Sequence, residues 1–398
     1  MTRTSAFCPA GISSLFRAET RSQPPYAMEE ACLVGAKGGG FVIAEGVDTE
    51  LILSPAKTNS IEVHINGRLA PDAKVTREVC NLLLPHVEGC FDIVVKHDIG
   101  VPIGAGYGAS AAGAVSTAMA LCKALGLNMT LNQMAQYAHF AELRCATGLG
   151  TVSGVIRGGA ILILEAGAPG YDRVDWLPLE PSHRIITASF APIPKEDIIF
   201  SPTTLEVVNR EAQTVMTHIL SNPDPVFFLE LCYQFAQKAG FLSERLTKIL
   251  AKVLKAGALG ATQNMIGDAF HALVYKEDVD KVVEAIAPVF PSNGLLVTEI
   301  NYGGPRYKER TNSLLCVRRE TNEKENLSFL IPPTTKIPVD FPISIDDGSR
   351  YCVYSPFPNL CSCYARILQL RRGRCVYHSG PLWTNHRWIC RRIWIYAR

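Results

Sequence analysis

The chain has 398 residues and a formal net charge of +2, and 47% of its residues are hydrophobic against 19% that are charged. This composition is typical of globular proteins and excludes a mostly disordered, collagen-like or coiled-coil chain. At roughly 150 residues per domain, the length predicts two or three domains.

The charges are spread unevenly along the chain. Residues 309–398 hold 14 Lys and Arg against 7 Asp and Glu, whereas residues 1–308 hold 25 against 30. From residue 349 onward there are nine Arg and five Cys, and no acidic residue. The only close cysteine pair there, Cys361 and Cys363, lacks the spacing of a structural zinc site. We therefore predict a basic, poorly structured extension over 308–398; its Arg and Trp residues leave nucleic acid or an anionic membrane surface as the alternative partner.

The first residues of the chain and its cysteine content are used to predict its cellular compartment. Pro9 and Gly11 interrupt any apolar run in the first sixteen residues, so we expect no signal peptide there. The thirteen cysteines are then expected to be free thiols in a reducing, cytoplasmic compartment. The uncharged window 99–122 contains only five Leu, Ile or Val and six Gly or Pro, so we predict no transmembrane helix.

Hydrophobic periodicity predicts the elements in chain order. Residues 32–63 read as short strands joined by tight turns. Gly126 is predicted to cap one helix, and Thr130 with Gln133 forms a capping-box pattern that begins the next. A mixed order of this kind favours two α+β domains meeting near residues 181–184. The predicted elements are helix 75–84, strand 91–97, helices 110–125 and 130–145, strands 158–165 and 184–190, helices 205–220, 226–239, 243–256, 262–274 and 278–290, and strand 295–300.

A glycine-rich loop leads from a strand into a helix at residues 102–112. Glycines let backbone N–H groups converge, and a helix start adds partial positive charge, so the segment is suited to bind an anion. It is not a Walker A loop, because the next lysine is Lys123, and it lacks the acidic residue that a dinucleotide fingerprint needs about 20 positions later. The alternative is a turn that packs two elements closely.

The same segment resembles the second motif of the GHMP kinases, with Tyr107 in place of a leucine and Ala109 in place of the first serine. The resemblance extends over residues 4–307 and is strongest to the archaeal pantoate kinase branch. It implies an α+β GHMP-kinase-like fold with an S5-like N-terminal ATP-binding domain (1–183), a ferredoxin-like C-terminal domain (184–307) and ATP in the cleft between them. The further segments that carry it are 7–12 with Phe16, 138–142, 147–150 and 167–170.

The resemblance also implies roles for single residues. Ser110 and Glu142 would hold Mg²⁺ and act in catalysis from a surface cleft, and His139 would contact the substrate. His139 and Glu142 lie three apart and so share one face of a helix. Taken alone, Glu142 would more often be a solvated acid on a helix face that pairs with a neighbour. For His139 the alternative is a surface histidine with an ordinary partner. The residues expected to bind ATP are Pro102, Gly104, Ala105, Gly106, Tyr107, Gly108, Ala109, Ser110 and Ala111.

Three positions depart from the pantoate kinase pattern. Thr151 stands where the family has an acidic residue, Ala36 stands where it has a serine before a basic residue, and Ile163 stands where it has an arginine for the substrate carboxylate. Loss of the acid is tolerable, because phosphoryl transfer depends mainly on positioning and electrostatics. We predict that Thr151 is a catalytic residue. Lys37 and Arg157 are predicted to bind the substrate in place of the missing arginine, and Arg144 is a further candidate.

Residues 257–267 occupy the place of the third GHMP motif. We predict a glycine turn at the start of a helix, facing the nucleotide. Because Ala, Gly and Met stretches are common where helices pack, the alternative is a packing role.

The combined prediction is an ATP- and Mg²⁺-dependent kinase for a small hydroxy acid, with pantoate and coenzyme A biosynthesis as the first choice. One alternative is a GHMP-fold kinase for a different small alcohol, which Ala36, Thr151 and Ile163 favour. Another is a nucleotide-binding protein without catalysis whose tail docks on nucleic acid or protein. We expect a homodimer by default, no membrane partner and no nucleic-acid partner.

Overall fold

The computed structural model describes residues 1–20, 26–191, 202–290, 294–308, 344–346 and 350–352. The chain divides into two compact units, Met1–Leu314 and Leu315–Arg398. The described part of the second unit is one antiparallel hairpin of β13 (Ser344–Asp346) and β14 (Arg350–Cys352). Apart from Lys308, the rest of the predicted 308–398 extension, including its cysteine pair, lies outside the described residues.

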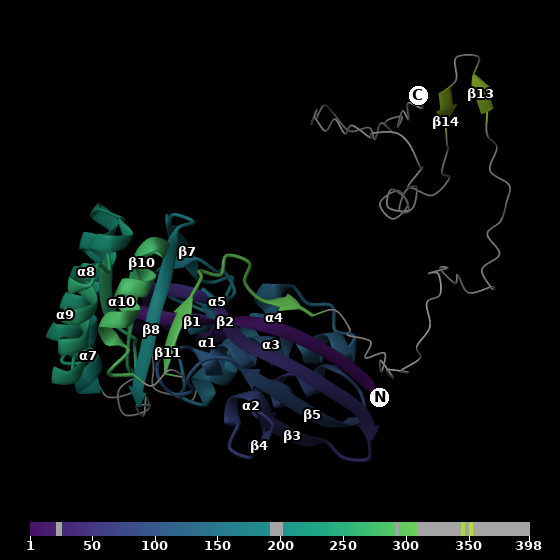
Figure 1. Ribbon diagram of the computed structural model, residues 1–398. Helices are drawn as coiled ribbons and strands as arrows, with labels where there is room; N and C mark the ends of the chain where they lie inside the picture. Colours follow the sequence, from purple (N-terminus) through teal and green to yellow (C-terminus); the bar gives the residue numbers. More distant parts are fainter. Residues whose placement is uncertain (21–25, 192–201, 291–293, 309–343, 347–349, 353–398) are drawn as a thin grey trace, which may run out of the picture. The chain divides into compact units, whose positions relative to one another are not determined.

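The first sheet is built on two long antiparallel strands, β1 (Thr2–Glu19) and β2 (Gly35–Ala56), which run along the length of the first unit (Figure 1). Its main path is β12-β1-β2-β5-β3-β4, and β6 and β7 extend it from the other end of β2. The sheet thus corrects one prediction, because a single 22-residue strand replaces the short strands and turns expected over much of 32–63. The remaining strands are β3 (Ser60–Ile65), β4 (Arg68–Leu69), β5 (Cys90–Ile99), β6 (Ala160–Glu165), β7 (Arg173–Leu177) and β12 (Arg306–Tyr307).

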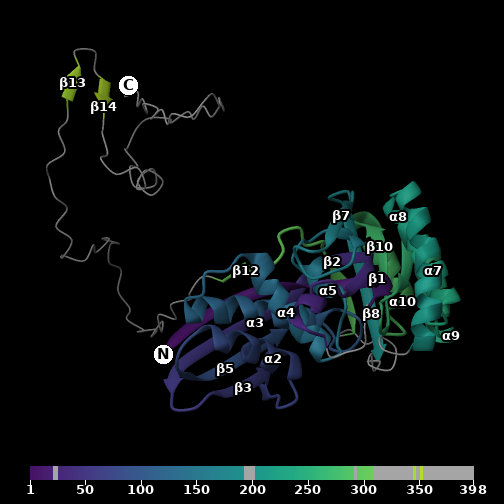
Figure 2. The ribbon, with the colours of Figure 1, turned by 180° about the vertical axis from the view of Figure 1, so that it is seen from behind.

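Helices cover one face of this sheet, with α3 (Ala109–Leu125) against β1 and β2 and with α2 (Lys74–Leu83) and α4 (Leu131–Arg144) beside it (Figure 2). The predicted caps are confirmed. Gly126 ends α3 in the left-handed conformation, and Thr130 and Gln133 form the capping box of α4. Alanine-rich α3 is buried on nearly all sides because it lies between the sheet and its neighbouring helices. Three short helices complete this part: α1 (Met28–Ala31), a 3₁₀ turn at Leu84–His86, and α5 (Thr151–Val155).

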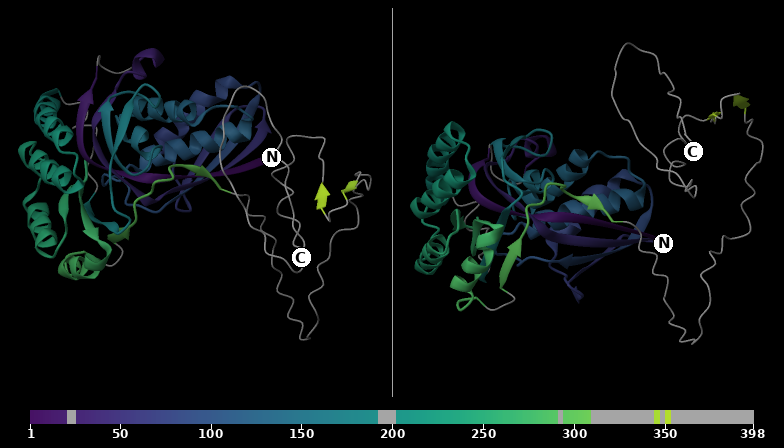
Figure 3. Two further views of the ribbon diagram at one scale, coloured as in Figure 1. Left: turned by 90° about the horizontal axis from the view of Figure 1, so that it is seen from above. Right: turned by 45° about the horizontal axis from the view of Figure 1, so that its top comes forward.

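The second sheet has the order β11-β8-β10-β9, and its helices form a separate layer at one end of the unit (Figure 3). The boundary predicted at residues 183 and 184 falls at the first residues of β8. The strands are β8 (His183–Ala191), β9 (Gly260–Gln263), β10 (Asp268–Tyr275) and β11 (Leu295–Thr298), and the helices are α7 (Pro202–Ser221), α8 (Pro225–Lys238), α9 (Glu244–Lys255), a 3₁₀ turn at Lys276–Asp278, and α10 (Val279–Ile286).

The helix predicted over 262–274 is wrong, because this stretch forms the hairpin of β9 and β10. The side chains of β10 are buried on both faces of the sheet: Phe270 and Ala272 pack in one cluster with α9, and Ala269 and Leu273 pack in the main core. A strand buried on both faces lacks the alternation of polar and apolar residues, so its sequence resembles a buried helix.

One hydrophobic core joins the two sheets. It includes Phe41 of β2, Ile185 of β8 and Phe228 of α8, and the Phe41 and Phe228 rings are 6.0 Å apart. Because they share this core, the two sheets form a single continuous body within Met1–Leu314, and the strands that meet at its centre position the candidate site.

None of the helices in the described part of the chain has the length and apolar character needed to span a membrane.

Candidate active site

A solvent-open pocket with roughly 710 Å³ of empty space lies where β1, β2 and β6 meet the turn between β9 and β10. The strands open here because β1 carries two bulges, between Pro9 and Gly11 and between Ser13 and Leu15. Polar backbone and apolar side chains share the walls. The lining residues are Gly11, Ile12, Ser13, Leu15, Phe16, Ala36, Lys37, Gly38, Gly39, Gly40, Phe41, Val42, Thr147, Gly148, Leu149, Gly150, Thr151, Gly154, Ile161, Ile163, Met265 and Ile266.

The glycines of β2 allow three strands to approach closely at this point. A Cβ on Gly40 would lie 2.0 Å from the carbonyl oxygen of Ile12, and one on Gly39 would lie 2.6 Å from that of Ile161. Any larger residue would push β2 away from its neighbours. The floor of the pocket is therefore backbone, which brings its N–H and C=O groups within reach of a bound molecule.

Among the described residues that line the pocket, Lys37 is the only charged one. Its Nζ lies 3.5 Å from Oε1 of Glu19, and the same carboxylate also pairs with Arg17. About a third of the Lys37 side chain is exposed. A partly exposed cation at the edge of an otherwise uncharged pocket is suited to attract one negative group of a small molecule.

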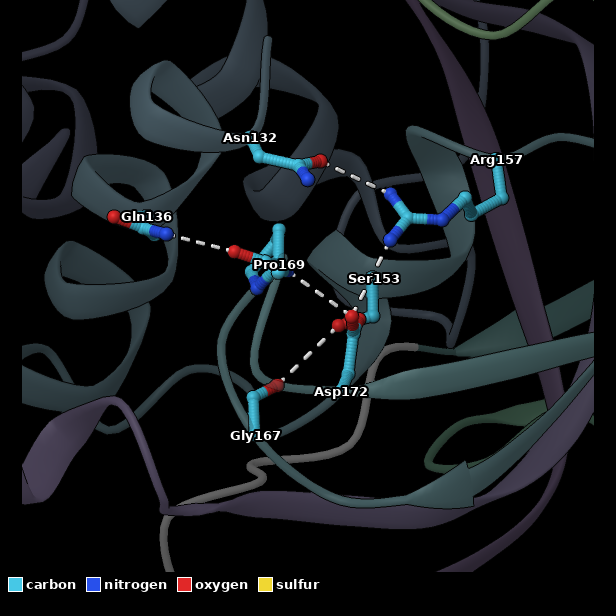
Figure 4. A network of polar contacts seen from close by, with 8 residues as sticks. Asn132, Gln136, Ser153, Arg157, Gly167, Pro169 and Asp172 are labelled. Carbon is cyan, nitrogen blue, oxygen red and sulfur yellow. Dashed lines mark hydrogen bonds and ion pairs between the residues drawn. The ribbon is translucent and has the colours of Figure 1, made fainter. Parts of the chain in front are cut away.

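Of the three cations considered for the missing arginine, the structure brings only Lys37 to the pocket. Arg157 donates to Oδ1 of Asn132 at 3.2 Å and lies 3.3 Å from Oδ1 of Asp172, as Figure 4 shows. The Asp172 side chain is fully buried, so Arg157 is its counter-ion. Arg144 pairs with Glu78 at 2.7 Å on a partly exposed face of α4. Neither arginine lines the pocket.

Thr151 begins α5 and lines the pocket. Its methyl group also contacts the glycine loop, because a Cβ on Gly108 would lie 2.6 Å from it. The same Gly108 position faces the carbonyl oxygen of Gly11 at 2.8 Å. Thr151 and Gly11 therefore form the wall between the pocket and the start of α3.

The glycine loop itself does not line the pocket but adjoins it through that wall. Gly104, Gly106 and Gly108 have φ of +77°, +85° and +63°, and Gly108 is the N-cap of α3. The first backbone bond of the helix is from Ala112 N–H to Gly108 O at 3.0 Å. The N–H groups of its first turn have no carbonyl partner within the helix, as at every helix start, and they are suited to bind an anion.

Ser110 and Glu142, the two predicted magnesium ligands, differ in how deeply they are buried. Ser110 is half-buried in the first turn of α3. The expectation that Glu142 lies at the surface is wrong, because it is only 2% exposed. Its Oε1 accepts a hydrogen bond of 2.7 Å from the Thr147 hydroxyl, and a Cβ on Gly148 would lie 2.3 Å from its Oε2. The carboxylate thus lies directly behind two residues that line the pocket.

His139 lies in the interior and does not line the pocket. It is 1% exposed, and its Nε2 lies 3.2 Å and 3.0 Å from the carbonyl oxygens of Ala31 and Val34. Because carbonyl oxygens only accept, Nε2 carries the proton. Burial lowers the pKa of this imidazole to about 4, so it is neutral at pH 7. Helix spacing placed His139 and Glu142 on one face, but that face packs inward and His139 supports the turn that leads into β2.

The third motif is a hairpin turn and not a helix start. Its residues nevertheless contact the glycine loop, since a Cβ on Gly106 would lie 2.8 Å from Cβ of Asn264, and one on Gly267 would lie 2.3 Å from the carbonyl carbon of Ala105. Met265 and Ile266 in the same turn line the pocket. The sequence prediction that residues 257–267 line the cleft thus holds for Met265 and Ile266. It missed Ser13, because a strand bulge carries no chemical signature of its own.

The chain is similar to known kinases in sequence. Residues 73–159 match the family model of the GHMP kinases N terminal domain. Pantoate kinase of Thermococcus kodakarensis is 27% identical over 288 residues, which cover 71% of this chain and 91% of that protein.

The chain also resembles solved structures. A phosphotransferase related to the coenzyme A biosynthesis pathway superimposes with a TM-score of 0.69 at 25% identity, covering 78% of this chain and all of that one. Mevalonate diphosphate decarboxylase of Enterococcus faecalis superimposes with a TM-score of 0.58 at 16% identity, covering 77% and 99% of the two chains, which speaks to the fold alone. The chain therefore has the α+β fold of the GHMP kinases and resembles the archaeal pantoate kinases.

Proposed function

We propose that the chain is an ATP-dependent phosphotransferase that phosphorylates the hydroxyl group of a small hydroxy acid. Pantoate is the first candidate, and 4-phosphopantoate, an intermediate on the way to coenzyme A, would be the product. The observation that carries the proposal is a pocket with one cation, Lys37, separated from an anion-binding helix start by a single wall of Gly11 and Thr151. The similarity to pantoate kinase and to a phosphotransferase of coenzyme A biosynthesis supports it.

We assign the nucleotide to the loop and helix start that Pro102, Gly104, Ala105, Gly106, Tyr107, Gly108, Ala109, Ser110 and Ala111 form within residues 1–183. The φ values of the three glycines and the open N–H groups of the first turn of α3 support this assignment. An anion at a helix start is stabilised by the helix dipole and by direct hydrogen bonds. Phosphates bound there would approach the pocket at the wall of Thr151.

A magnesium ion fits the oxygen donors that are present. Mg²⁺ is commonly bound by one or two carboxylates together with substrate phosphates and water. Glu142 offers a buried carboxylate behind Thr147 and Gly148, and Ser110 offers a hydroxyl at the start of α3. Among the described residues no three His, Cys, Asp or Glu side chains cluster, and such a magnesium site needs no cluster of that kind. When bound, the ion would neutralise charge on the phosphates.

The pocket would hold the acceptor. We assign the carboxylate of the hydroxy acid to Lys37, and its aliphatic part to walls such as Ile163 and Phe16. The Thr151 hydroxyl would orient the acceptor hydroxyl toward the phosphates without removing its proton in advance, since a loose phosphoryl-transfer transition state needs little basic assistance. His139 would act indirectly, by holding the turn before β2.

One feature of the pocket favours an acceptor other than pantoate. The walls of the pocket lack the bidentate guanidinium that recognises a carboxylate best, because Ile163 lies in the lining and Arg157 is bonded to Asp172. A small alcohol with a different anionic group, or with none, therefore remains the competing proposal for the same chemistry.

The test measures ADP release by the full-length chain with Mg·ATP and a panel of pantoate, homoserine, mevalonate and glycerate. Turnover selective for pantoate is expected. Selective turnover of another acceptor would establish the competing proposal. Tight binding of Mg·ATP without release of ADP for any acceptor would instead favour a nucleotide-binding protein that does not catalyse transfer. Light scattering on the same sample tests the proposed homodimer.

Two variants test the assignment of the metal. Ser110→Ala and Glu142→Gln should each lower kcat by at least about a hundredfold, because each removes an oxygen that would hold the magnesium ion. Ser60→Ala and Glu244→Gln, at exposed positions, are the matched controls and should keep the parental rate. A near-normal rate in either test variant would overturn the metal assignment.

A further inference from the structure

A buried chain of polar side chains links the second bulge of β1 to the turn between β9 and β10. The Ser14 hydroxyl lies 2.7 Å from Nε2 of His271, and Nδ1 of His271 lies 2.8 Å from Oδ1 of Asn264. All three residues are fully buried. Because the amide oxygen of Asn264 only accepts, Nδ1 carries the proton, and Nε2 accepts the hydrogen bond from Ser14.

A second hydrogen-bonded group ties Tyr107 of the glycine loop to β10 at Phe270, the residue before His271. The Thr187 hydroxyl donates to the carbonyl oxygen of Phe270 at 2.5 Å, so it accepts the bond of 2.7 Å from the Tyr107 hydroxyl. Among the described residues Nδ2 of Asn264 has no hydrogen-bond partner, and the Asn264 side chain packs against Gly106, the neighbour of Tyr107. Tyr107 is 1% exposed and stands where the GHMP motif has a leucine. The interlobe network is the set Ser14, His271, Asn264, Tyr107 and Thr187.

Backbone contacts run alongside this network. Met265 N–H donates to the carbonyl oxygen of Ser13 at 2.8 Å, and Gly11 N–H donates to that of Tyr107 at 3.2 Å. Gly11, Ser13 and Met265 line the pocket. The same β9–β10 turn packs on Gly106 through Asn264. The turn therefore touches the glycine loop on one side and the wall of the pocket on the other.

We propose that Tyr107 and Ser14 are positioning residues, and that the interlobe network holds the glycine loop in register with the acceptor pocket. The proposal rests on the proposed function, in which the loop binds the nucleotide. Transfer between two bound groups depends steeply on their alignment, and a displacement of about 1 Å can lower the rate by roughly a hundredfold. A leucine at position 107 would fill space but form no bond to Thr187.

The first test separates positioning from binding. Tyr107→Phe keeps the ring and removes one hydroxyl, and it should lower kcat about tenfold while the Kd of a non-hydrolysable ATP analogue and that of the acceptor stay within about twofold. Tyr137→Phe, which removes a hydroxyl bonded at 2.7 Å to His86 on an exposed face, is the control and should keep the parental kcat. A parental kcat in Tyr107→Phe would overturn the proposal. If Tyr107→Phe unfolds below the assay temperature, Thr187→Val is measured with the same expectation.

The second test asks whether the two ends of the network act together. The factor by which kcat falls in the double variant of Ser14→Ala and Tyr107→Phe should be close to the larger of the two factors for the single variants, because either change interrupts the same connection. A double loss equal to the product of the single losses would show two independent sites and would refute the network.

The third test needs no substrate, so it separates failure of this proposal from failure of the proposed function. In the unliganded full-length chain, Ser14→Ala should speed hydrogen exchange of the amides of residues 104–110, to which Ser14 is linked through His271 and Asn264. Unchanged exchange in the loop would overturn the proposal even if the chain is an active kinase. Faster exchange would support it even if no acceptor is phosphorylated.

Discussion

Lys37 shows how a single side chain can define the chemistry of a pocket. Every other residue that lines the pocket is uncharged, so an acceptor carboxylate has one cation to approach. A hydrogen bond to a charged group contributes about 1.5–3 kcal/mol. Residue type and spacing left three basic candidates for this role. Lys37 is the one that lines the pocket, whereas Arg157 pairs with Asp172 and Arg144 pairs with Glu78.

We expect Lys37→Ala to raise the KM of the acceptor by about 10- to 100-fold, because the cation that binds its carboxylate is removed. The KM of ATP should stay within about twofold, since the glycine loop is separate from the pocket. Initial rates of ADP release check both values. Lys37→Arg should recover much of the loss, and Lys248→Ala, on an exposed face of α9, serves as the control. Equal KM values in parent and Lys37→Ala would refute the assignment.

Arg157 illustrates the opposite outcome, a candidate for substrate binding that the fold uses to neutralise a buried acid. Arg157→Met should lower the free energy of unfolding by about 2 kcal/mol or more, because Asp172 would remain buried without its counter-ion. Urea unfolding measures the change. The double variant with Asp172→Asn should recover part of it, whereas Arg173→Met, in an exposed pair, should have little effect. A raised KM of the acceptor with unchanged stability would contradict this role.

At the scale of elements, strand β2 depends on glycine where it passes the pocket. Gly40→Ala should destabilise the chain by several kcal/mol, since its Cβ would lie 2.0 Å from the Ile12 carbonyl oxygen and the β1 to β2 pairing would have to open. Gly303→Ala is the matched control, because the nearest atom to its Cβ would be 3.9 Å away. Thermal unfolding of the two variants tests this, and similar midpoints would contradict it.

The elements that were predicted well are those whose signals are local. The capping box of Thr130 and Gln133 and the terminal Gly126 depend on residues within one turn of the helix end, so the sequence suffices. The β9–β10 hairpin was mistaken for a helix because burial on both faces is a property of the packed molecule. The bulges of β1 were missed for a similar reason, since they exist only relative to the partner strand β2.

In the molecule as a whole, buried histidines of the described residues couple stability to pH, and His97, His139 and His271 are the most deeply buried of them. Burial lowers the pKa of His97 and His139 to about 4 and that of His271 to about 3. Each imidazole stays neutral in the folded chain at pH 6, whereas in the unfolded chain it takes up a proton as the pH falls through about 6.5. The stabilisation is thus complete above about pH 6.5 and is lost progressively as the pH falls toward the folded values.

We therefore expect the free energy of unfolding to decrease between about pH 6.5 and pH 4, by up to about 1.4 kcal/mol per pH unit for each histidine. Urea unfolding at several pH values measures the slope. His97→Gln should reduce it, because one titrating group is removed, and His218→Gln, at an exposed position of α7, should not. The same free energy at about pH 7.5 and pH 5 would rule out this linkage.

The glycine loop, most helix and strand positions, the resemblance to GHMP kinases and the basic and acidic candidate residues could all be predicted from the amino-acid sequence, because they depend on residue type and short spacing. The packed structure was needed to show that Lys37 lines the pocket while Arg157 and His139 do not. It was also needed to show that Glu142 is buried behind Gly148 and that Tyr107 reaches Thr187 in the second sheet. Whether a polar side chain binds a ligand or a neighbour depends on which distant strands enclose it. That property belongs to the packed chain and not to the local sequence.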